Sequence, residues 1–314
     1  MALWVSAAVV VVSLVVLERG AEYLVEGLGS LSDRFGISEA VVGASIAAVG
    51  SSMPEFGSAV FSVVENEPTI GFGTIVGSAI FNITVIIGGS ALFGKVVIDR
   101  KVIYRDGAFY LFTVIVALVG IRDGVLTRSE AVMWALLFVV YLAWLFYDAR
   151  RGEPVPNESF EDLSARLSAV YVAGGLVATA VAARYLVVHV ESLSVELGVS
   201  TAVFSLVAVA AGTSVPDLFT SLRSAQKGMG SLAVANAVGS NIFDILGGLG
   251  VPFAFRAATS VEAALDLSAL ALLGSVVLAL LVVGYGFSLT RRKGYVLLGA
   301  YAAYIVVLLT QGSF

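Results

Sequence analysis

The chain has 314 residues, of which 59 % are hydrophobic and only 13 % are charged, and its mean hydropathy is +0.98. An ordinary soluble domain carries roughly 25 % charged residues, so this composition excludes a water-soluble globule and predicts an integral membrane protein. The net charge of −5, with basic residues spread between apolar runs, argues against nucleic-acid binding, and the absence of cysteine excludes disulfides and thiolate metal sites.

Ten apolar segments follow one another along the chain, each near the ~20 residues that a membrane-spanning helix needs. The first has neither a basic start nor a small-residue cleavage site, so we expect a retained helix rather than a signal peptide. The segments are continuously apolar and too long for barrel strands, which excludes a β-barrel and predicts an all-α fold. The approximate spans are 3–31, 39–63, 70–92, 104–121, 129–148, 166–195, 200–224, 230–252, 261–285 and 294–311.

The longest polar stretch, 148–166, divides the chain into two halves of five segments each. We expect a first repeat at 1–148, a linker at 149–165 and a second repeat at 166–314, because a shift of 162 aligns the matching stretches of the two halves without a gap. This shift places Tyr23-Leu24-Val25 on Tyr185-Leu186-Val187 and Pro54 on Pro216, and it relates a motif at 43–89 to one at 205–251. With five segments per copy, the second copy must enter the membrane from the opposite side. Such inverted repeats are typical of transporters whose substrate site lies near the midplane.

Lys and Arg residues lie mainly in every second link between segments. Thirteen lie in the links after segments 1, 3, 5, 7 and 9 or within two residues of them, three lie in the other links, and two lie well within segments. Cytoplasmic loops carry the excess of basic residues, so we expect the 148–166 linker in the cytoplasm and both termini outside, in a multi-pass protein of the plasma membrane. The thirteen residues are Arg34, Lys95, Arg100, Lys101, Arg105, Arg150, Arg151, Arg166, Arg223, Lys227, Arg291, Arg292 and Lys293.

Three acidic side chains lie deep in apolar segments: Glu55 in the second, Asp217 in the seventh and Asp244 in the eighth. An acid at such a depth costs several kcal/mol and by default marks a functional site. Glu55 and Asp217 each follow a proline, which kinks a helix and frees a backbone carbonyl. In lipid this is tolerated where the freed backbone lines a cavity or binds a ligand.

Hydroxyl and amide side chains accompany these acids at helical spacing. They are Ser51 and Ser52 beside Glu55, Thr213 and Ser214 beside Asp217, Ser78 with Asn82, and Ser240 with Asp244. Such a set of hard oxygen donors suits Ca²⁺, which takes 6–8 oxygens. Without a nearby histidine or thiolate, the set argues against zinc, copper or iron. The sequence therefore predicts a duplicated cation site.

Two other classes of membrane protein place acids within helices. An intramembrane aspartyl protease would use two aspartates, but it would show Tyr-Asp and Gly-x-Gly-Asp motifs, whereas Pro216 and Phe243 precede the acids here. A cation channel would more naturally build an acidic ring from oligomeric symmetry than from an internal duplication. We therefore predict a transporter that is not an enzyme and carries no cofactor.

The duplicated motifs resemble the two α-repeats of the cation/Ca²⁺ exchanger superfamily, and most closely those of its prokaryotic sodium/calcium exchangers. The resemblance covers both halves and rests on Gly50-Ser-Ser-Met-Pro-Glu55, Gly212-Thr-Ser-Val-Pro-Asp217, Gly77-Ser-Ala-Ile-Phe-Asn82 and Gly239-Ser-Asn-Ile-Phe-Asp244. It implies ten helices, four of which surround the ions. We expect alternating access, with segments 1 and 6 as the moving gate, because they lack the ion motifs and are rich in Gly and small residues.

The resemblance implies a role for each motif residue. Glu55 and Asp217 would be the central Ca²⁺ carboxylates, assisted by backbone carbonyls near Ser51 and Thr213. Asn82 and Asp244 would complete the diamond of ligands. The flanking Na⁺ sites would use Ser52, Ser78, Ser214 and Ser240, with the carbonyls of Ala48 and Ala210.

The counter-ion stays open between Na⁺, H⁺ and K⁺. Many prokaryotic members have Glu in both proline motifs, and the mixed pair of Glu55 and Asp217, with Asp244, resembles the K⁺-dependent Na⁺/Ca²⁺ branch. Proton-coupled Ca²⁺ exchangers usually carry a Gly-Asn-Ala-Ala-Glu type motif, which is absent here. This favours Na⁺ without excluding H⁺. At the periphery, the 162 shift also aligns Glu22 with Arg184 and suggests an ion pair between the halves.

Overall fold

The computed structural model describes residues 3–34, 51–93, 96–149, 163–260 and 263–311, and this part of the chain is mostly helical. Seven of its helices are long and apolar enough to cross a membrane. A further pair, Thr201–Thr213 and Val215–Gln226, passes the same test as one span that is bent by 49°. The chain is therefore a multi-pass helical membrane protein.

The first half begins with α1 (Leu3–Arg34), which has 32 residues. The regular elements that follow are α4 (Met53–Val64), α5 (Pro68–Phe81), α6 (Ile87–Ser90), β1 (Val96–Val97), α7 (Ala108–Gly120), β2 (Val125–Thr127) and α8 (Arg128–Ala149). Between α5 and α6 the chain widens into a π-helix at Asn82–Ile86, and a second π-helix at Val102–Gly107 leads into α7.

The second half begins with α9 (Ala165–Leu197), whose N-cap Ser164 accepts a hydrogen bond from the Leu167 N–H at 3.2 Å. It continues through α10 (Thr201–Phe204), α11 (Ala210–Thr213), α12 (Val215–Gln226), α13 (Gly230–Phe243), α14 (Gly250–Phe253), β3 (Ala258–Ser260), α15 (Ala263–Gly284), β4 (Ser288–Leu289) and α16 (Arg291–Gln311). π-Helices join α10 to α11 (Ser205–Val209) and α13 to α14 (Asp244–Leu249).

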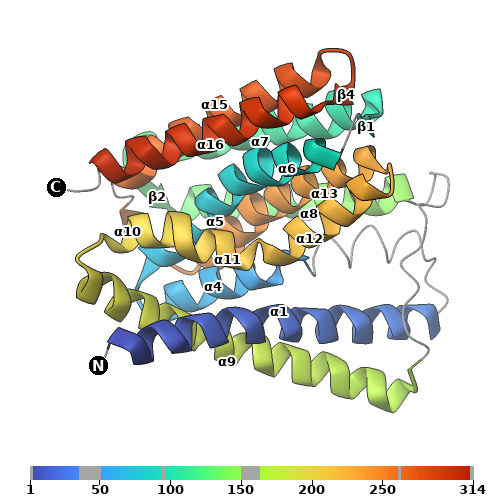
Figure 1. Ribbon diagram of the computed structural model, residues 1–314. Helices are drawn as coiled ribbons and strands as arrows, with labels where there is room; N and C mark the ends of the chain where they lie inside the picture. The colour runs from blue at the N-terminus through green and yellow to red at the C-terminus, as the bar shows by residue number, and fades with distance from the viewer. Residues whose placement is uncertain (1–2, 35–50, 94–95, 150–162, 261–262, 312–314) are drawn as a thin grey trace.

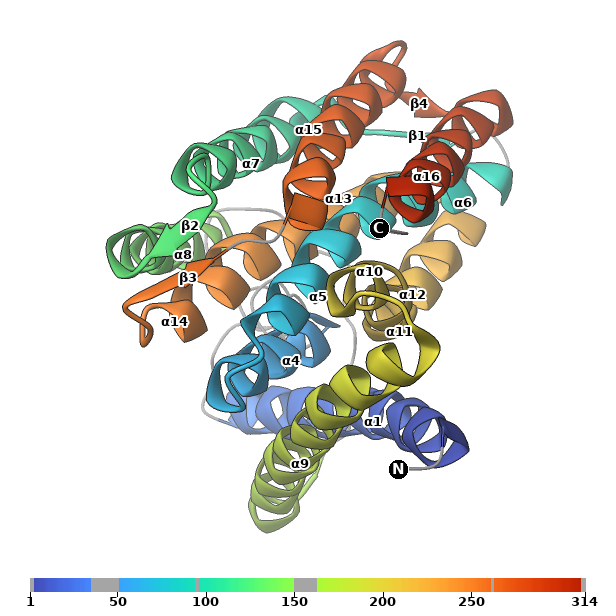
Figure 2. The same ribbon diagram turned by 90° about the vertical axis from the view of Figure 1, so that its left-hand side faces the viewer.

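The helices α5 and α13 lie at the centre of the molecule, between α1 and α9 on one side and α7, α15 and α16 on the other (Figure 2). Of the most apolar stretch of each span, 89 % is buried in Pro68–Phe93 and 78 % in Gly230–Phe253, against 22 % in Arg291–Thr310. A helix that is apolar on all sides packs in the interior. The outer helices therefore present their remaining apolar faces to lipid.

The close packing of α5 depends on Gly77. A Cβ atom at this position would lie 2.1 Å from the Leu206 carbonyl oxygen and 2.7 Å from the Ala210 Cβ atom. Small residues allow such approach between membrane helices. The glycine therefore brings α5 against the broken helix Thr201–Thr213.

The elements of the two halves correspond in position. The shift of 162 that relates the motifs also carries the bounds of α4 onto α12, those of α5 onto α13, and the first residue of the π-helix at Asn82 onto the π-helix at Asp244. Short antiparallel strands then pair across the halves: β1 with β4, and β2 with β3. Each half thus supplies one strand to each of the two ribbons.

The helices α1 and α9 form a separate layer below the main body in the view of Figure 1. They cross closely at Gly175, where a Cβ atom would lie 2.6 Å from the Gly20 carbonyl oxygen. Side chains of this pair, including Leu17, Leu186 and Val190, belong to a second apolar cluster that is distinct from the main core. The pair therefore packs mainly on itself and more lightly on the central helices.

Candidate functional site

Two helices start at the expected proline motifs. The backbone turns at Ser52 (φ −93°, ψ 4°) and at Ser214 (φ −83°, ψ 5°), and α4 and α12 begin directly afterwards with proline in the first turn. Proline fits this position because its missing N–H would have no intrahelical partner there. Glu55 and Asp217 therefore stand in the first turn of α4 and α12, where the helix dipole favours a carboxylate.

The Glu55 carboxylate is fully buried and lies among serine hydroxyls of other helices. The hydroxyl of Ser214 donates to Glu55 Oε1 at 3.3 Å, and that of Ser78 lies 3.5 Å from the same atom. Ser78 also donates to Asp244 Oδ2 at 3.4 Å. Two carboxylates, from α4 and from the π-helix after α13, thus meet through one hydroxyl of α5.

The Asp217 carboxylate occupies the corresponding place in the second half. Its Oδ1 atom accepts hydrogen bonds from the Ser240 hydroxyl and from Asn236 Nδ2, both at 3.2 Å, and its Oδ2 atom accepts from Asn82 Nδ2 at 3.3 Å. The pairs Ser78–Glu55 and Ser240–Asp217 are related by the shift of 162. The duplicated sequence therefore builds two similar half-sites that face each other.

No basic side chain balances these acids in the described part of the chain. The ion pairs seen there, Arg19–Glu22, Arg105–Asp106 and Arg184–Glu65, involve other acids. Three buried oxygens, Glu55 Oε2, Asn82 Oδ1 and Asp244 Oδ1, have no hydrogen-bond partner. Buried charge without a partner is costly, so the cluster is built to receive positive charge.

The ligand chemistry of this cluster is mixed. Among the described residues, no group of three or more His, Cys, Asp or Glu side chains is arranged to hold a metal ion. A cation in the cluster would therefore need hydroxyl, amide and backbone oxygens as well as carboxylates, which is the set that hard cations accept.

Comparison with known families assigns the chain. The sodium/calcium exchanger protein family matches residues 5–147 and 167–310, which lie on both sides of the expected linker. The chain belongs to this family.

Alignments with individual relatives extend over most of this chain. An uncharacterised membrane protein of Methanocaldococcus jannaschii is 30 % identical over 76 % of this chain and 78 % of its own length. The sodium/calcium exchanger MaX1 of Methanosarcina acetivorans is 26 % identical over 96 % of this chain and 97 % of its own. A solved structure of the sodium-calcium exchanger NCX_Mj, soaked with Na⁺ and Sr²⁺, superimposes with a TM-score of 0.66 at 28 % identity, covering 97 % of this chain and 98 % of that one.

Most motif residues named from the sequence meet in the cluster. Besides the three acids, these are Ser51, Ser52, Ser78, Asn82, Ser214 and Ser240. The Ser51 and Ser240 hydroxyls lie 3.2 Å apart, and the Ser52 hydroxyl lies 3.5 Å from the Ser240 carbonyl oxygen. The Thr213 hydroxyl donates within its own helix, to the carbonyls of Val209 and Ala210 at 3.2 Å. Ala48 lies outside the described residues.

The structure adds two amides that the sequence analysis missed. Asn236 donates to Asp217, and Asn241 accepts from Asn82 at 3.0 Å. Asn236 stands one helical turn before Ser240, so the spacing that singled out Ser240 and Asp244 could have revealed it. The place of Asn241 depends on contacts between the halves, which no local spacing indicates.

The expected ion pair between Glu22 and Arg184 is wrong. Glu22 pairs with Arg19 three residues earlier on its own helix at 2.7 Å, and Arg184 pairs with Glu65 at the end of α4 at 2.8 Å. Residues three apart on a helix are neighbours, and this local partner takes the place of the distant one.

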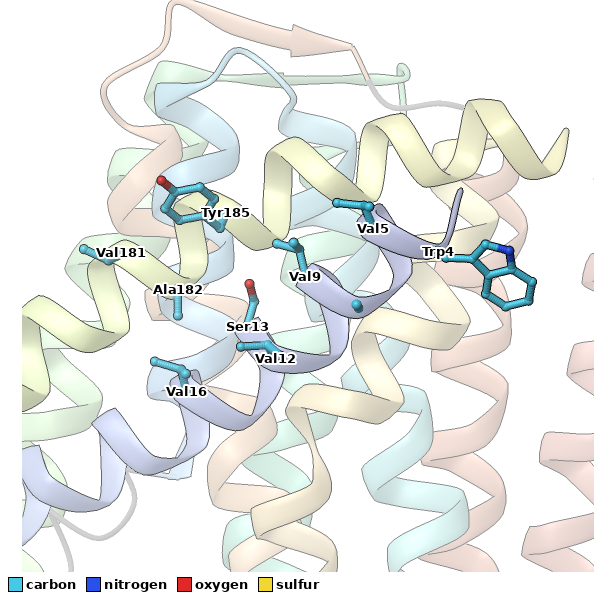
Figure 3. Close-up of a pocket in the computed structure, with 10 residues that line it drawn as sticks. Trp4, Val5, Val9, Val12, Ser13, Val16, Val181, Ala182 and Tyr185 are labelled. Atoms are coloured by element: carbon cyan, nitrogen blue, oxygen red, sulfur yellow. The ribbon is translucent and has the colours of Figure 1, made fainter. Parts of the chain in front are cut away.

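A cavity of about 500 Å³ lies away from the acidic cluster, between α1 and α9. Figure 3 shows its lining, which is largely apolar and includes Val9, Val12 and Ala182, with Ser13 and Tyr185 as polar members. A hydrophobic groove without carboxylates does not suit a cation. The cavity is therefore not a candidate ion site.

Proposed function

We propose that this chain is a secondary-active antiporter that exchanges Ca²⁺ for Na⁺ across the membrane. The observation that carries the proposal is the cluster of Glu55, Asp217 and Asp244, buried among hydroxyls and amides without a basic partner among the described residues. An intramembrane acid of this kind marks an ion pathway. The names of the relatives MaX1 and NCX_Mj, both sodium/calcium exchangers, support the same activity.

In this proposal Glu55 and Asp217 are the central Ca²⁺ carboxylates. Ser52, Ser78, Ser214 and Ser240 serve the flanking Na⁺ sites with the carbonyls of Ala48 and Ala210, while carbonyls near Ser51 and Thr213 assist Ca²⁺, and Asn82 and Asp244 complete the set. Ser51, Ser52, Ser78, Ser214 and Ser240 meet the carboxylates in one buried cluster, which supports a shared site. The Ala210 carbonyl accepts from the Thr213 hydroxyl and has a second lone pair for an ion.

The architecture we propose is ten transmembrane helices in two inverted repeats, 1–148 and 166–314, joined by the linker 149–165. The matched bounds of α4 and α12 and of α5 and α13 support the duplication. The strand pairs support the inversion: β1, which follows the third segment, meets β4, which follows the ninth, and these two links share a membrane side only if the second repeat is inverted.

For the orientation we propose a plasma-membrane protein whose two termini are extracellular and whose linker is cytoplasmic. The excess of Lys and Arg in the links after the odd-numbered segments supports this. The ribbon of β1 and β4 would then lie on the cytoplasmic side and that of β2 and β3 on the extracellular side.

Transport would proceed by alternating access, with α1 and α9 moving against the central helices. Their close packing on each other, with Gly175 against Gly20, supports a pair that moves together as one unit. An empty site that holds up to three negative charges resists closure in a medium of low dielectric constant, which accounts for obligatory exchange.

The counter-ion decides between Na⁺, H⁺ and K⁺ coupling, and purified protein in vesicles tests it directly. We expect an outward Na⁺ gradient to drive saturable ⁴⁵Ca²⁺ uptake into Na⁺-loaded proteoliposomes. Uptake driven by a pH gradient without Na⁺, and unaffected by added Na⁺, would establish H⁺/Ca²⁺ exchange instead. A requirement for K⁺ together with Na⁺ would establish the K⁺-dependent form, and flux that neither saturates nor depends on a counter-ion would indicate a channel.

A further inference from the structure

Asn82 and Asp244 occupy equivalent positions in the two halves, but their side chains differ in one respect. The two oxygens of the Asp244 carboxylate are interchangeable, so either can face an ion. The Asn82 amide has one oxygen and one nitrogen, and only the oxygen can bind a cation. An asparagine in an ion site must therefore be held in one of its two orientations.

The structure contains a hydrogen-bond chain that fixes this orientation. Asn241 on α13 donates from Nδ2 to the backbone carbonyl of Ala79 at 3.0 Å and to the hydroxyl of Tyr110 at 2.8 Å. A carbonyl oxygen can only accept, so the nitrogen of Asn241 must face Ala79 and its Oδ1 atom must face away. That oxygen accepts from Asn82 Nδ2 at 3.0 Å.

The second contact of Asn82 acts in the same direction. Its Nδ2 atom also donates to Asp217 Oδ2 at 3.3 Å, so a rotated amide would set its oxygen against two acceptors. The Asn82 Oδ1 atom is left buried and without a hydrogen-bond partner. Buried polar atoms are rarely left so, and a cation would satisfy this one.

We propose that Asn241 and Tyr110 are positioning residues for the ion site, which hold the Asn82 amide so that its oxygen faces the cation. The inference rests on the proposed function and deepens it. The arrangement is asymmetric in the way the chemistry requires. Asn241 aligns with Ala79, which has no side-chain amide. By the same symmetry Ala79 would have to position Asp244, but a carboxylate needs no such orientation.

Tyr110 extends the chain to a helix outside the motifs. It lies on α7, its side chain is fully buried, and its hydroxyl takes the second hydrogen of the Asn241 amide. Outer partners of ion ligands act in this manner, and their loss typically costs about 10-fold or more in affinity.

The test measures cation binding and flux in the full-length exchanger. Asn241→Leu removes the whole chain of contacts, and Tyr110→Phe removes one hydroxyl. Tyr304→Phe is the matched control, since it removes a buried hydroxyl that bonds Ser268 at 2.9 Å between α15 and α16. Na⁺- and Ca²⁺-dependent thermal stabilisation of the purified protein reports binding without transport, and ⁴⁵Ca²⁺ flux reports half-saturation and maximal rate.

We expect Asn241→Leu to raise the half-saturation concentration of Na⁺ or Ca²⁺ about 10-fold, with a smaller change in the maximal rate. Tyr110→Phe should act in the same direction, and Tyr304→Phe should have no effect. In an Asn82→Ala background, Asn241→Leu should cause no further loss, because its effect passes through Asn82.

Equal losses in both backgrounds would overturn the inference, as would a Tyr110→Phe protein that binds both cations like the control. If Asn241→Leu does not fold, the Tyr110→Phe comparison still decides. Failure of the wild-type protein to exchange Ca²⁺ would count against the proposed function. Normal wild-type exchange with unchanged variants would count against the positioning role alone.

Discussion

Replacement of Asp217 by asparagine removes one charge from the site with almost no change in size. The carboxylate accepts hydrogen bonds from Ser240, Asn236 and Asn82, among others. An asparagine side chain can keep the hydrogen bonds that its oxygen accepts. Its nitrogen cannot accept and would face at least one donor, so about one buried hydrogen bond is lost at a cost of about 1–3 kcal/mol. A stability of about 5–15 kcal/mol tolerates this loss, and we expect a folded, membrane-inserted protein.

The electrostatic loss is larger and depends on the ion. Two unit charges about 4 Å apart interact by about 4 kcal/mol at an effective dielectric constant of about 20, so a divalent ion loses about 8 kcal/mol of attraction and a monovalent ion about 4. Desolvation cancels much of this attraction. One third of the divalent loss, about 3 kcal/mol, already weakens Ca²⁺ binding about 100-fold. Asp217→Asn should therefore abolish Ca²⁺ transport and weaken Na⁺ binding less.

The assay is Na⁺-driven ⁴⁵Ca²⁺ uptake, combined with thermal stabilisation of the purified protein by each ion. Asp217→Glu is the matched control: it retains the charge and gives the second proline motif the acid that Glu55 supplies in the first. We expect this variant to transport Ca²⁺, and Glu55→Gln to fail as Asp217→Asn does. Ca²⁺ exchange at near wild-type rate and half-saturation in Asp217→Asn or Glu55→Gln would refute the assignment of the central carboxylates.

Three further predictions concern orientation, coupling and packing. A Gly312→Cys variant of this cysteine-free chain should react with an impermeant thiol reagent from the extracellular side, and labelling from the cytoplasmic side alone would invert the topology. Asp244→Asn should change the dependence of Ca²⁺ flux on pH or K⁺ more than its Ca²⁺ affinity, because the aligned residue of the other half is neutral; the opposite ranking would remove Asp244 from counter-ion binding. Gly77→Ala should destabilise the protein by about 1–3 kcal/mol or more, because the new Cβ atom would lie 2.1 Å from a carbonyl oxygen. The control, Gly274→Ala on α15, meets nothing within 4 Å and should leave the melting temperature unchanged or higher. Equal melting temperatures for the two variants would contradict this account.

The sequence was sufficient to locate the helices in the described part of the chain. The expected spans 104–121 and 230–252 compare with Val102–Gly120 and Gly230–Phe253, because long apolar runs bounded by polar links leave little freedom in where a membrane helix begins and ends. The segment 39–63 is described only from residue 51. Glu55, Asp217 and their serines could be identified because the duplication repeats them at a fixed shift, whereas Asp244, which aligns with the neutral Asn82, could be identified by its depth in an apolar segment.

Contacts between distant parts of the chain could not be predicted in this way. Tyr110 and Asn241 are 131 residues apart, and their hydrogen bond depends on how α7 packs on α13. Arg184 likewise finds Glu65 across 119 residues, where the sequence shift suggested another acid. Periodicity and repeats report what shares a helix face or a repeat position, whereas such pairs depend on tertiary packing.

The strand ribbons that join the halves restrict the motions open to this exchanger. Val96 pairs with Leu289 in one ribbon and Val125 pairs with Ser260 in the other, and the two ribbons lie toward opposite ends of the helix bundle (Figure 1). A rocking of one half as a rigid body against the other would shear backbone hydrogen bonds at both ends together. α1 and α9 contribute no residue to either ribbon. Sliding of α1 and α9 along the central helices would keep every hydrogen bond of both strand pairs. The ribbons therefore favour a transport motion in which the outermost layer moves and the two halves stay joined.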